Sequence, residues 1–364
     1  MVMASKIFSW RPSIFRAHAG RIREAPRNRT GFIAFNRVHQ IKMLDVAGQS
    51  LRVGIRHGKS SSPLLVIFNG IGANLELLEP FVSALKGIEI VVFDVPGVGG
   101  SPPPKLPYRY ARIAQLTNRL LTALGYTEQV DVLGLSWGGM LAQQYAYLNP
   151  KRCRRLILAA TSSGWTMLPG HFSAVRKLTS SRRHRDPDYF RRIAPELYGG
   201  SFRQRPDLFD RHIGRTQPSR GVGYYYQLAA LWGWTSMPWL YRLRQPTLIL
   251  AGTEDPIIPL ANARIMAHLM RRSELFTIDD GHLFLITRAN EVAPVVKQFL
   301  AKPIDKDLMG SPTGIVSRLS RLARRLRFGS SGPPLFQATA VFRPPLFSLI
   351  AHLEAGLGGR CRRR

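Results

Sequence analysis

The sequence predicts an α/β fold: a mostly parallel sheet covered by helices on both faces, with an inserted, mainly helical cap. Between residues 63 and 300, short apolar strand candidates alternate with amphipathic helix candidates. Strands that are apolar at nearly every position are typical of parallel sheets buried on both faces. The alternation stops once, between residues 161 and 245, in a span rich in Arg, Tyr and Trp. Such a long interruption indicates helical or loop material set outside the sheet.

The predicted elements begin with a hairpin over 41–56, in which two strand-like runs flank the turn VAGQS. Further strands are expected at 63–69, 88–94, 130–135, 155–160, 246–252 and 274–279. Helices are expected over 75–85, 110–124, 137–148, 261–269 and 289–300. We interpret the interruption as a cap over the carboxyl edge of the sheet, where ligands of α/β proteins bind.

The α/β domain is expected over 39–302, with the cap inserted at about 162–244. Residues 1–38 are rich in Arg and nearly free of acidic residues, which favours a disordered extension or a start codon placed too far upstream; an organellar transit peptide has the same composition. Residues 303–364 form a basic tail, in which 313–327 predict a basic amphipathic helix. Such a helix can lie on an anionic or apolar surface, dock on its own domain, or stay unfolded.

Composition narrows the class of protein. With 364 residues, 45% of them hydrophobic, the chain can bury one large core, and disorder throughout is excluded. No apolar run is long enough for a transmembrane helix. Two cysteines, Cys153 and Cys361, cannot form a disulfide framework or a metal cluster, and no secretory segment is evident, so a reducing intracellular compartment is expected. The net charge of +30, densest in the two tails, favours contact with an anionic surface or molecule.

The stretch GLSWG at residues 134–138 matches G-x-S-x-G between a predicted strand and a predicted helix, which is the nucleophile elbow of the α/β-hydrolase fold. The glycines lack a Cβ, so neighbouring backbone can pass close to a strained turn. Ser136 is the candidate nucleophile, and the Trp137 N–H at the start of the helix can stabilise an oxyanion. A serine hydroxyl needs a base oriented by a carboxylate, and in this fold the chain order is serine, acid, histidine.

The acid and the base are sought downstream of Ser136. Glu254 and Asp255 both follow a predicted strand; Asp255 is favoured because a residue before proline is held extended, but Glu254 stays open. His282 lies in a loop after the last predicted strand. Asp279 and Asp280 are too close to it in sequence to be its expected partner and are predicted to shape its turn.

The remaining candidate residues bind the substrate or the oxyanion. The loop FNGIGANLE places Asn69 near the site and nominates the Ile71 N–H as second oxyanion donor. The aromatic stripe of the cap can form the core of this subdomain, line the substrate cleft, or do both. Its candidate substrate contacts, together with Asn69, are Tyr224, Tyr225, Trp232 and Trp234. Neither GIGAN nor the glycines in 93–104 have nucleotide-binding spacing, so the latter predict a tight loop. No cofactor and no metal are predicted.

Several stretches together resemble the intracellular poly(3-hydroxyalkanoate) depolymerases, especially those acting on medium-chain-length polyesters. They are LLVIFNGIGANLELLEPFV, FDVPGVGGS, GLSWGGMLAQQYA, YGGSFR, GWTSMPWL, QPTLILAGTEDPIIPL and IDDGHLFLITRA. The resemblance covers roughly residues 45–300 and implies a triad of Ser136, Asp255 and His282, which decides against Glu254. It also implies a cytoplasmic enzyme, without cofactor, on the surface of storage polyester granules. The two tails have no counterpart in the family pattern.

Two other functions remain open from the sequence. A small-ester, lactone or thioester hydrolase would keep the same triad. A non-catalytic granule- or nucleic-acid-binding protein would explain the charge but would not need the triad; no specific nucleic acid is expected as partner. Dehalogenases and epoxide hydrolases of this fold are discounted because their nucleophile is an aspartate where this chain has Ser136.

Overall fold

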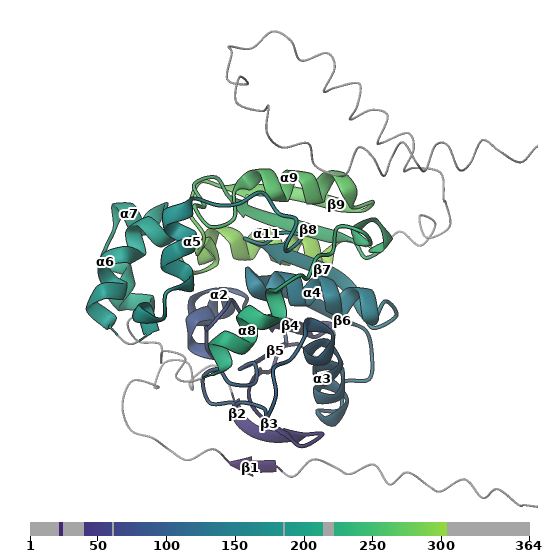
Figure 1. Ribbon diagram of the computed structural model, residues 1–364. Coiled ribbons are helices and arrows are strands. Elements are labelled where there is room, and N and C mark those ends of the chain that lie inside the picture. The colour runs from purple at the N-terminus through teal and green to yellow at the C-terminus, as the bar shows by residue number, and fades with distance from the viewer. Residues whose placement is uncertain (1–21, 25–39, 60–61, 185, 214–221, 304–364) are drawn as a thin grey trace, which may run out of the picture. The chain divides into compact units, whose positions relative to one another are not determined.

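A computed structural model of the protein describes residues 22–24, 40–59, 62–184, 186–213 and 222–303 (Figure 1). Within them, nine strands form one sheet in the order β1-β2-β3-β5-β4-β6-β7-β8-β9. The strands are β1 (Ile22–Glu24), β2 (Gln40–Val46), β3 (Gln49–Arg56), β4 (Leu65–Phe68), β5 (Ile90–Phe93), β6 (Val130–Leu135), β7 (Cys153–Ala159), β8 (Thr247–Gly252) and β9 (Ser273–Ile278). The strands from β5 across to β9 are parallel, and β1, β2 and β3 pair antiparallel. The predicted mostly parallel sheet and its opening hairpin are confirmed.

Helices cover both faces of this sheet. They are η1 (Leu75–Leu78), α2 (Glu79–Ala84), α3 (Tyr110–Ala123), α4 (Trp137–Leu148), α9 (Leu260–Leu269), α10 (Phe284–Thr287) and α11 (Ala289–Ala301). Helices α2 and α11 share one apolar core with one face of the sheet, and α3, α4 and α9 share a second core with the other face. The α/β class is therefore confirmed.

The side-chain alternation of the strands explains these two cores. In β4, Leu65 and Ile67 belong to the core beneath α2 and α11, whereas Val66 and Phe68 belong to the core beneath α3 and α4. Successive side chains of a strand point to opposite faces, so a strand buried on both sides must be apolar throughout. Each such side chain contributes roughly 2 kcal/mol by leaving water.

All elements that the structure describes between β7 and β8 are helical. They are α5 (Phe172–Thr179), η2 (Ser181–His184), α6 (Pro187–Tyr198), α7 (Ser201–Gln204), η3 (Phe209–Ile213), α8 (Gly223–Leu231) and η4 (Leu240–Arg242). Helix α6 starts at Pro187, its N-cap Asp186 accepts a hydrogen bond from the Tyr189 N–H, and it buries Ile193 and Leu197 on one face. In Figure 1, α5, α6 and α7 group beside the sheet. The inserted, mainly helical cap is thus confirmed.

Two details differ from the sequence-based expectation, and one predicted helix lies outside the described residues. Strand β1, which pairs with β2, lies inside the segment 1–38, whose composition predicted no regular element. The expected helix over 75–85 divides into η1 and α2, with Pro80 at the start of α2. The predicted amphipathic helix at 313–327 and the rest of the tail from residue 304 lie outside the described residues. In the part of the chain that the structure describes, no helix has the length and apolar character needed to cross a membrane.

Candidate active site

Ser136 lies at the joint between β6 and α4, where its backbone has φ of +56° and ψ of −117°. This left-handed conformation is unusual for a residue with a side chain and costs roughly 1–3 kcal/mol. The surroundings hold it in place: the Ser136 N–H donates to Ala159 O at 2.8 Å, and Thr161 Oγ1 donates to Ser136 O at 2.7 Å. The turn therefore has the strained geometry of a nucleophile elbow.

The neighbouring glycines are required by close backbone contacts. A Cβ on Gly134 would lie 2.2 Å from Gly138 O, and a Cβ on Gly138 would lie 2.3 Å from Phe68 O. Both distances are far below van der Waals contact, and both obstacles are main-chain atoms. The crowding that the sequence pattern suggested is confirmed, since β6, α4 and the end of β4 meet at this turn.

The structure brings Ser136, Asp255 and His282 together. His282 Nε2 lies 3.0 Å from Ser136 Oγ, and His282 Nδ1 lies 2.7 Å from Asp255 Oδ2. The three residues follow the carboxyl ends of β6, β8 and β9, which are adjacent to one another or one strand apart in the sheet. Because a carboxylate only accepts hydrogen bonds, the Nδ1 nitrogen carries the proton and Nε2 faces the serine hydroxyl as an acceptor.

Two carboxylates compete for the acid position, and their surroundings differ. The second oxygen of Asp255, Oδ1, accepts hydrogen bonds from the N–H groups of Ile257 at 2.8 Å and Ile258 at 2.9 Å. Its side chain is buried. Glu254, in contrast, pairs with Arg203 at 2.9 Å, and both of these side chains are exposed to solvent. Of the two candidates, only Asp255 contacts His282.

The loop that holds His282 is fixed by the cap. The His282 N–H donates to Tyr198 O at 2.7 Å, and the Tyr198 ring lies parallel to the imidazole at 6.5 Å between centroids. Asp280 is buried, and its Oδ1 accepts from the Ser201 N–H at 2.6 Å and the Gly281 N–H at 2.7 Å. The prediction that Asp280 shapes this turn is confirmed.

The cap residues Tyr198 and Ser201 were not identified from the sequence. Both contact the loop through bonds between segments far apart in the chain, and no local pattern reports such bonds. The only sequence signal was their stretch YGGSFR among the segments of the family resemblance.

The loop after β4 lies beside Ser136. A Cβ on Gly70 would lie 3.8 Å from Ser136 Cβ. In this loop the Gly70 N–H donates to Asn69 Oδ1 and the Gly72 N–H donates to Gln227 Oε1. Among the described residues, the N–H groups of Ile71 and Trp137 have no acceptor. Two N–H groups of this kind beside a nucleophile can hold a developing oxyanion.

Three of the five residues predicted to contact the substrate form hydrogen bonds within the protein instead. Asn69 is buried, and its Nδ2 donates to Asn74 O at 2.6 Å. Tyr224 is buried, with its hydroxyl donating to Leu178 O at 2.6 Å. The Trp234 indole N–H donates to Gln144 Oε1 at 2.7 Å. Trp232 and Tyr225 differ, since 68% and 53% of their surfaces are exposed.

The glycine-rich loop over 93–104 is built around Asp94. This carboxylate is buried and accepts hydrogen bonds from the N–H groups of Leu75 and Gly100, both at 2.8 Å. Burial raises the pKa of Asp94 to about 6, although the nearby Arg52 guanidinium acts in the opposite direction. Gly99 has φ of +52°, and a Cβ there would lie 2.2 Å from Asp94 Oδ2. The tight loop expected from the sequence is confirmed.

The described residues contain no group of three His, Cys, Asp or Glu side chains arranged to hold a metal ion. The chemistry available at this site is that of a hydroxyl nucleophile, an imidazole base and backbone N–H donors. These groups together can transfer an acyl group.

Comparison with known proteins gives the same chemistry. Residues 63–289 match the family model of the alpha/beta hydrolase fold. The chain is 48% identical to a poly(3-hydroxyalkanoate) depolymerase of Ectopseudomonas oleovorans, over 74% of this chain and 95% of that protein. It is 24% identical to 3-oxoadipate enol-lactonase 2 of Acinetobacter baylyi, over 66% of this chain and 91% of that one.

Among solved structures, a hydrolase from Pseudomonas aeruginosa is similar, with a TM-score of 0.62 and 25% identity. The match covers 72% of this chain and 99% of that one. The nucleophile elbow, the sheet order and these likenesses agree: the chain belongs to the α/β-hydrolase family and, within it, to the poly(3-hydroxyalkanoate) depolymerases.

Proposed function

We propose that this protein is a serine esterase that hydrolyses an intracellular poly(3-hydroxyalkanoate) of the medium-chain-length type and releases 3-hydroxy acids. The observation that carries the proposal is the hydrogen-bonded chain Asp255–His282–Ser136 at the nucleophile elbow. The 48% identity to a depolymerase supports the choice of polyester as substrate.

In the first half of the reaction, Ser136 Oγ attacks the ester carbonyl carbon while His282 Nε2 takes the hydroxyl proton. Asp255 stabilises the imidazolium that forms. The N–H groups of Trp137 and Ile71 hold the oxyanion of the tetrahedral intermediate; one such donor is worth about 10²–10³ in rate in other serine hydrolases. The ester C–O bond then breaks, His282 returns the proton to the departing hydroxyl end of the polymer, and a 3-hydroxyacyl group remains on Ser136.

In the second half, water replaces the polymer hydroxyl. His282 takes a proton from the water as its oxygen attacks the acyl carbon, and the same two N–H groups hold the new oxyanion. The bond to Oγ breaks, Oγ regains the proton from His282, and the 3-hydroxy acid leaves. No oxidant, reductant or cofactor is needed for either half.

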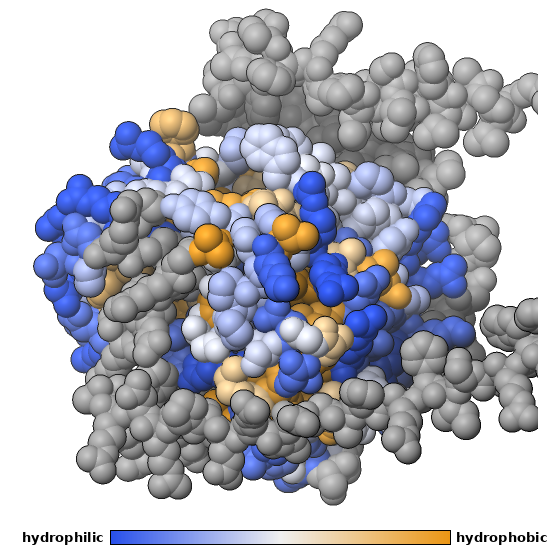
Figure 2. All heavy atoms as spheres, turned by 60° about the horizontal axis from the view of Figure 1, so that its bottom comes forward, coloured by the Kyte–Doolittle hydropathy of each residue, from blue (hydrophilic) through white to orange (hydrophobic). Residues whose placement is uncertain are grey.

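The apolar side chains exposed on the cap support the proposal that the substrate is an insoluble apolar polymer. Apart from Leu148, the large apolar side chains exposed in the described residues belong to the cap or to the loop before α3: Leu106, Trp165, Leu168, Phe172, Val222, Tyr225 and Trp232. Trp165 and Trp232 pack together at 4.9 Å between ring centroids, and Arg109, which follows that loop, donates to Trp232 O. Figure 2 shows one face of the molecule, on which hydrophobic side chains lie in several small groups among hydrophilic ones. Exposed apolar groups that cluster mark interaction surfaces.

The proposal places the enzyme in the cytoplasm, on the surface of storage granules. The polyester itself would contact the cap surface. The basic tails, of which the structure describes only Ile22–Glu24 and the first residue of the C-terminal one, remain candidates for contact with an anionic surface through their charge.

The test is the release of 3-hydroxy acids from amorphous granules of medium-chain polyester, beside granules of short-chain polyester. We expect release from the medium-chain granules, and none from either when Ser136→Ala replaces the native chain. The variant should unfold at the same temperature as the native chain, because Ser136 is only partly buried. Substantial esterase activity in the folded variant would contradict the proposal.

A lactone or small-ester hydrolase is the second candidate, favoured by the likeness to 3-oxoadipate enol-lactonase 2. The same triad opens a lactone by the same steps. Cleavage of soluble esters or lactones without any release from granules would establish this candidate and exclude the polyester.

A further inference from the structure

A cavity of about 1000 Å³ lies at the amino-terminal edge of the sheet. Its lining residues precede β6, β7, β8 and β9, begin β7, or lie at the ends of α4 and η4; those used below are Tyr147, Lys151, Arg154, Arg242, Arg244 and Gln245. The triad follows the carboxyl ends of the same strands. A six-residue strand spans about 20 Å, so the cavity is separate from the proposed active site.

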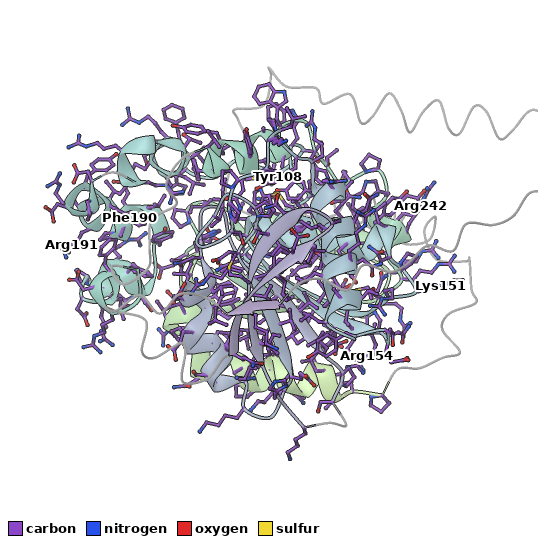
Figure 3. The ribbon with its side chains drawn as sticks, turned by 90° about the horizontal axis from the view of Figure 1, so that it is seen from below. Tyr108, Lys151, Arg154, Phe190, Arg191 and Arg242 are labelled. Atoms are coloured by element: carbon purple, nitrogen blue, oxygen red, sulfur yellow. The ribbon has the colours of Figure 1, made fainter. Side chains whose placement is uncertain are left out.

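Figure 3 shows the molecule from below, with three residues of the cavity lining and two residues of α6 among those labelled. Lys151, Arg154 and Arg242 lie along one side of the molecule, and Phe190 and Arg191 of the cap lie on the other. The cavity therefore lies on the opposite side of the molecule from helix α6 of the cap.

The charge of the cavity lining is one-sided. Six of its residues are Lys or Arg and none is Asp or Glu. Arg154 is neutralised by Asp131, with 2.8 Å between Nε and Oδ1. In the part of the chain that the structure describes, Lys151, Arg242 and Arg244 form no ion pair with a carboxylate. Cations gathered around one cavity repel one another, and a bound anion relieves that repulsion.

The uncharged lining restricts the ligand further. Tyr147 stacks on Trp239 at 4.4 Å between centroids and an interplanar angle of 29°, so its ring is held in one orientation. Gln245 is 94% buried and its Nε2 donates to Ala146 O at 3.1 Å. Its Oε1 has no donor among the described residues and is closed to solvent, so Gln245 lines the cavity without offering this oxygen to a ligand.

We propose that this cavity binds an organic phosphate of nucleotide size, with a nucleoside diphosphate as the best match. The phosphates would contact Lys151, Arg242 and Arg244, and a planar ring would lie against Tyr147. The volume suits a ligand of this size. Inorganic phosphate would use only the cations, and an uncharged nucleoside would use only the Tyr147 ring.

The test is calorimetric titration of the full chain with ADP, with arms for adenosine, inorganic pyrophosphate and vesicles of phosphatidylglycerol. The cavity variant is Lys151→Gln/Arg244→Gln. The matched control is Lys86→Gln/Arg112→Gln, which removes two exposed charges outside the cavity. Hydrolysis of a soluble ester is measured for each variant and should stay the same, since neither pair lies at the triad.

We expect ADP to bind the native chain and the control variant alike, and the cavity variant at least ~10-fold more weakly, since two charge-assisted contacts are lost. Pyrophosphate should bind more weakly than ADP, and adenosine should not bind measurably. An equal loss in both double variants would overturn the proposal, as would no ADP binding. Binding to vesicles alone, lost in the cavity variant, would assign the cations to a lipid phosphate and would likewise overturn the nucleotide proposal.

Discussion

Asp255 and Glu254 are neighbours in the chain, yet their carboxylates have opposite surroundings. Asp255 is buried against His282 and two backbone N–H groups, and Glu254 reaches out to Arg203. Since the strand β8 ends just before them, adjacent side chains there point in different directions. One of the two positions can therefore face the loop after β9, and the other cannot.

This contrast gives a prediction with an adjacent control. In Asp255→Asn, the amide can donate to Nδ1, which shifts the proton to Nε2 and removes the base, so kcat should fall about 10⁴-fold, as in other serine hydrolases with this change. Glu254→Gln loses only an exposed ion pair, and kcat should change by less than about threefold. Steady-state hydrolysis of a soluble ester measures both. Similar losses in the two variants would refute the assignment of the acid.

Asp94 makes the stability depend on pH. Its pKa in the native state, about 6, lies above its ordinary value of 3.8, so the native state keeps a proton that the unfolded chain releases. Its contribution is fully present below the unfolded pKa and is lost as pH rises through the folded pKa. The free energy of unfolding of the native chain, relative to Asp94→Asn, should therefore fall by roughly 2 kcal/mol between pH 4 and pH 7. Urea unfolding at several pH values measures it, and a difference that does not vary with pH would contradict it.

At the scale of elements, β6, α4 and the end of β4 pack so closely at the elbow that a Cβ would not fit at Gly134 or Gly138. In Gly138→Ala the new carbon would meet Phe68 O at 2.3 Å and Asn69 O at 2.5 Å. Main-chain atoms cannot turn aside as a side chain can, so we expect a loss of roughly 3 kcal/mol in the free energy of unfolding.

The matched control is Gly70→Ala in the neighbouring loop. Its Cβ would meet its nearest neighbour at 3.8 Å, an ordinary contact, so its free energy of unfolding should change by less than about 1 kcal/mol. Urea unfolding compares the two variants. Equal stability of both would show that the glycines of the elbow are not required by packing.

The cap combines two surfaces. Its inner side fixes the His282 loop through Tyr198 and Ser201, and its outer side exposes Trp165 and Trp232. Substitutions on the inner side should lower the rate with every substrate, whereas substitutions on the outer side should lower the rate only with a substrate large enough to reach it.

We therefore expect Trp165→Ala/Trp232→Ala to lower the rate on polyester granules by about tenfold, the scale of a lost aromatic anchor. Its kcat/KM for a small soluble ester should stay within about twofold of the native value. Leu148→Ala, which removes an exposed apolar side chain away from the cap, serves as control and should change neither rate. Equal loss on granule and soluble ester would show that the tryptophans serve the fold instead of the polymer surface.

At the scale of the whole molecule, the sequence was most informative about the sheet. Apolar runs such as β4 and β6 are buried on both faces, so their pattern alone places them in a covered sheet, and Ser136 then falls at a strand-to-helix turn. The order serine, acid, histidine follows from the fold. These features are local, and the family resemblance added the choice of Asp255 and the nature of the substrate.

Contacts between distant segments could not be predicted in the same way. The bond from His282 to Tyr198 joins a loop to a helix of the cap, and the Asp280 bond to Ser201 does the same. The aromatic residues of the cap were likewise ambiguous: a stripe of Tyr and Trp does not reveal which ring hydrogen-bonds inside, as Trp234 does, and which is exposed, as Trp232 is. The lining of the cavity at the amino edge comes from four separate segments of the chain, so no single sequence motif predicts it.

The two proposed sites of the molecule lie at opposite edges of the sheet. The proposed ester chemistry lies at the carboxyl edge of the sheet beneath the cap, and the proposed phosphate site lies at the amino edge. The central claim concerns the first of these: that Ser136 carries a 3-hydroxyacyl group during turnover.

Mass spectrometry of the acid-quenched enzyme tests that claim most directly. The chain is mixed with an excess of a medium-chain 3-hydroxyalkanoate oligomer, quenched within the first turnovers and digested. We predict one 3-hydroxyacyl unit, or a short oligomer of it, on the peptide that contains Ser136, and no adduct in Ser136→Ala. Hydrolysis of the oligomer without an adduct on that peptide, or with an adduct on another residue, would contradict the account.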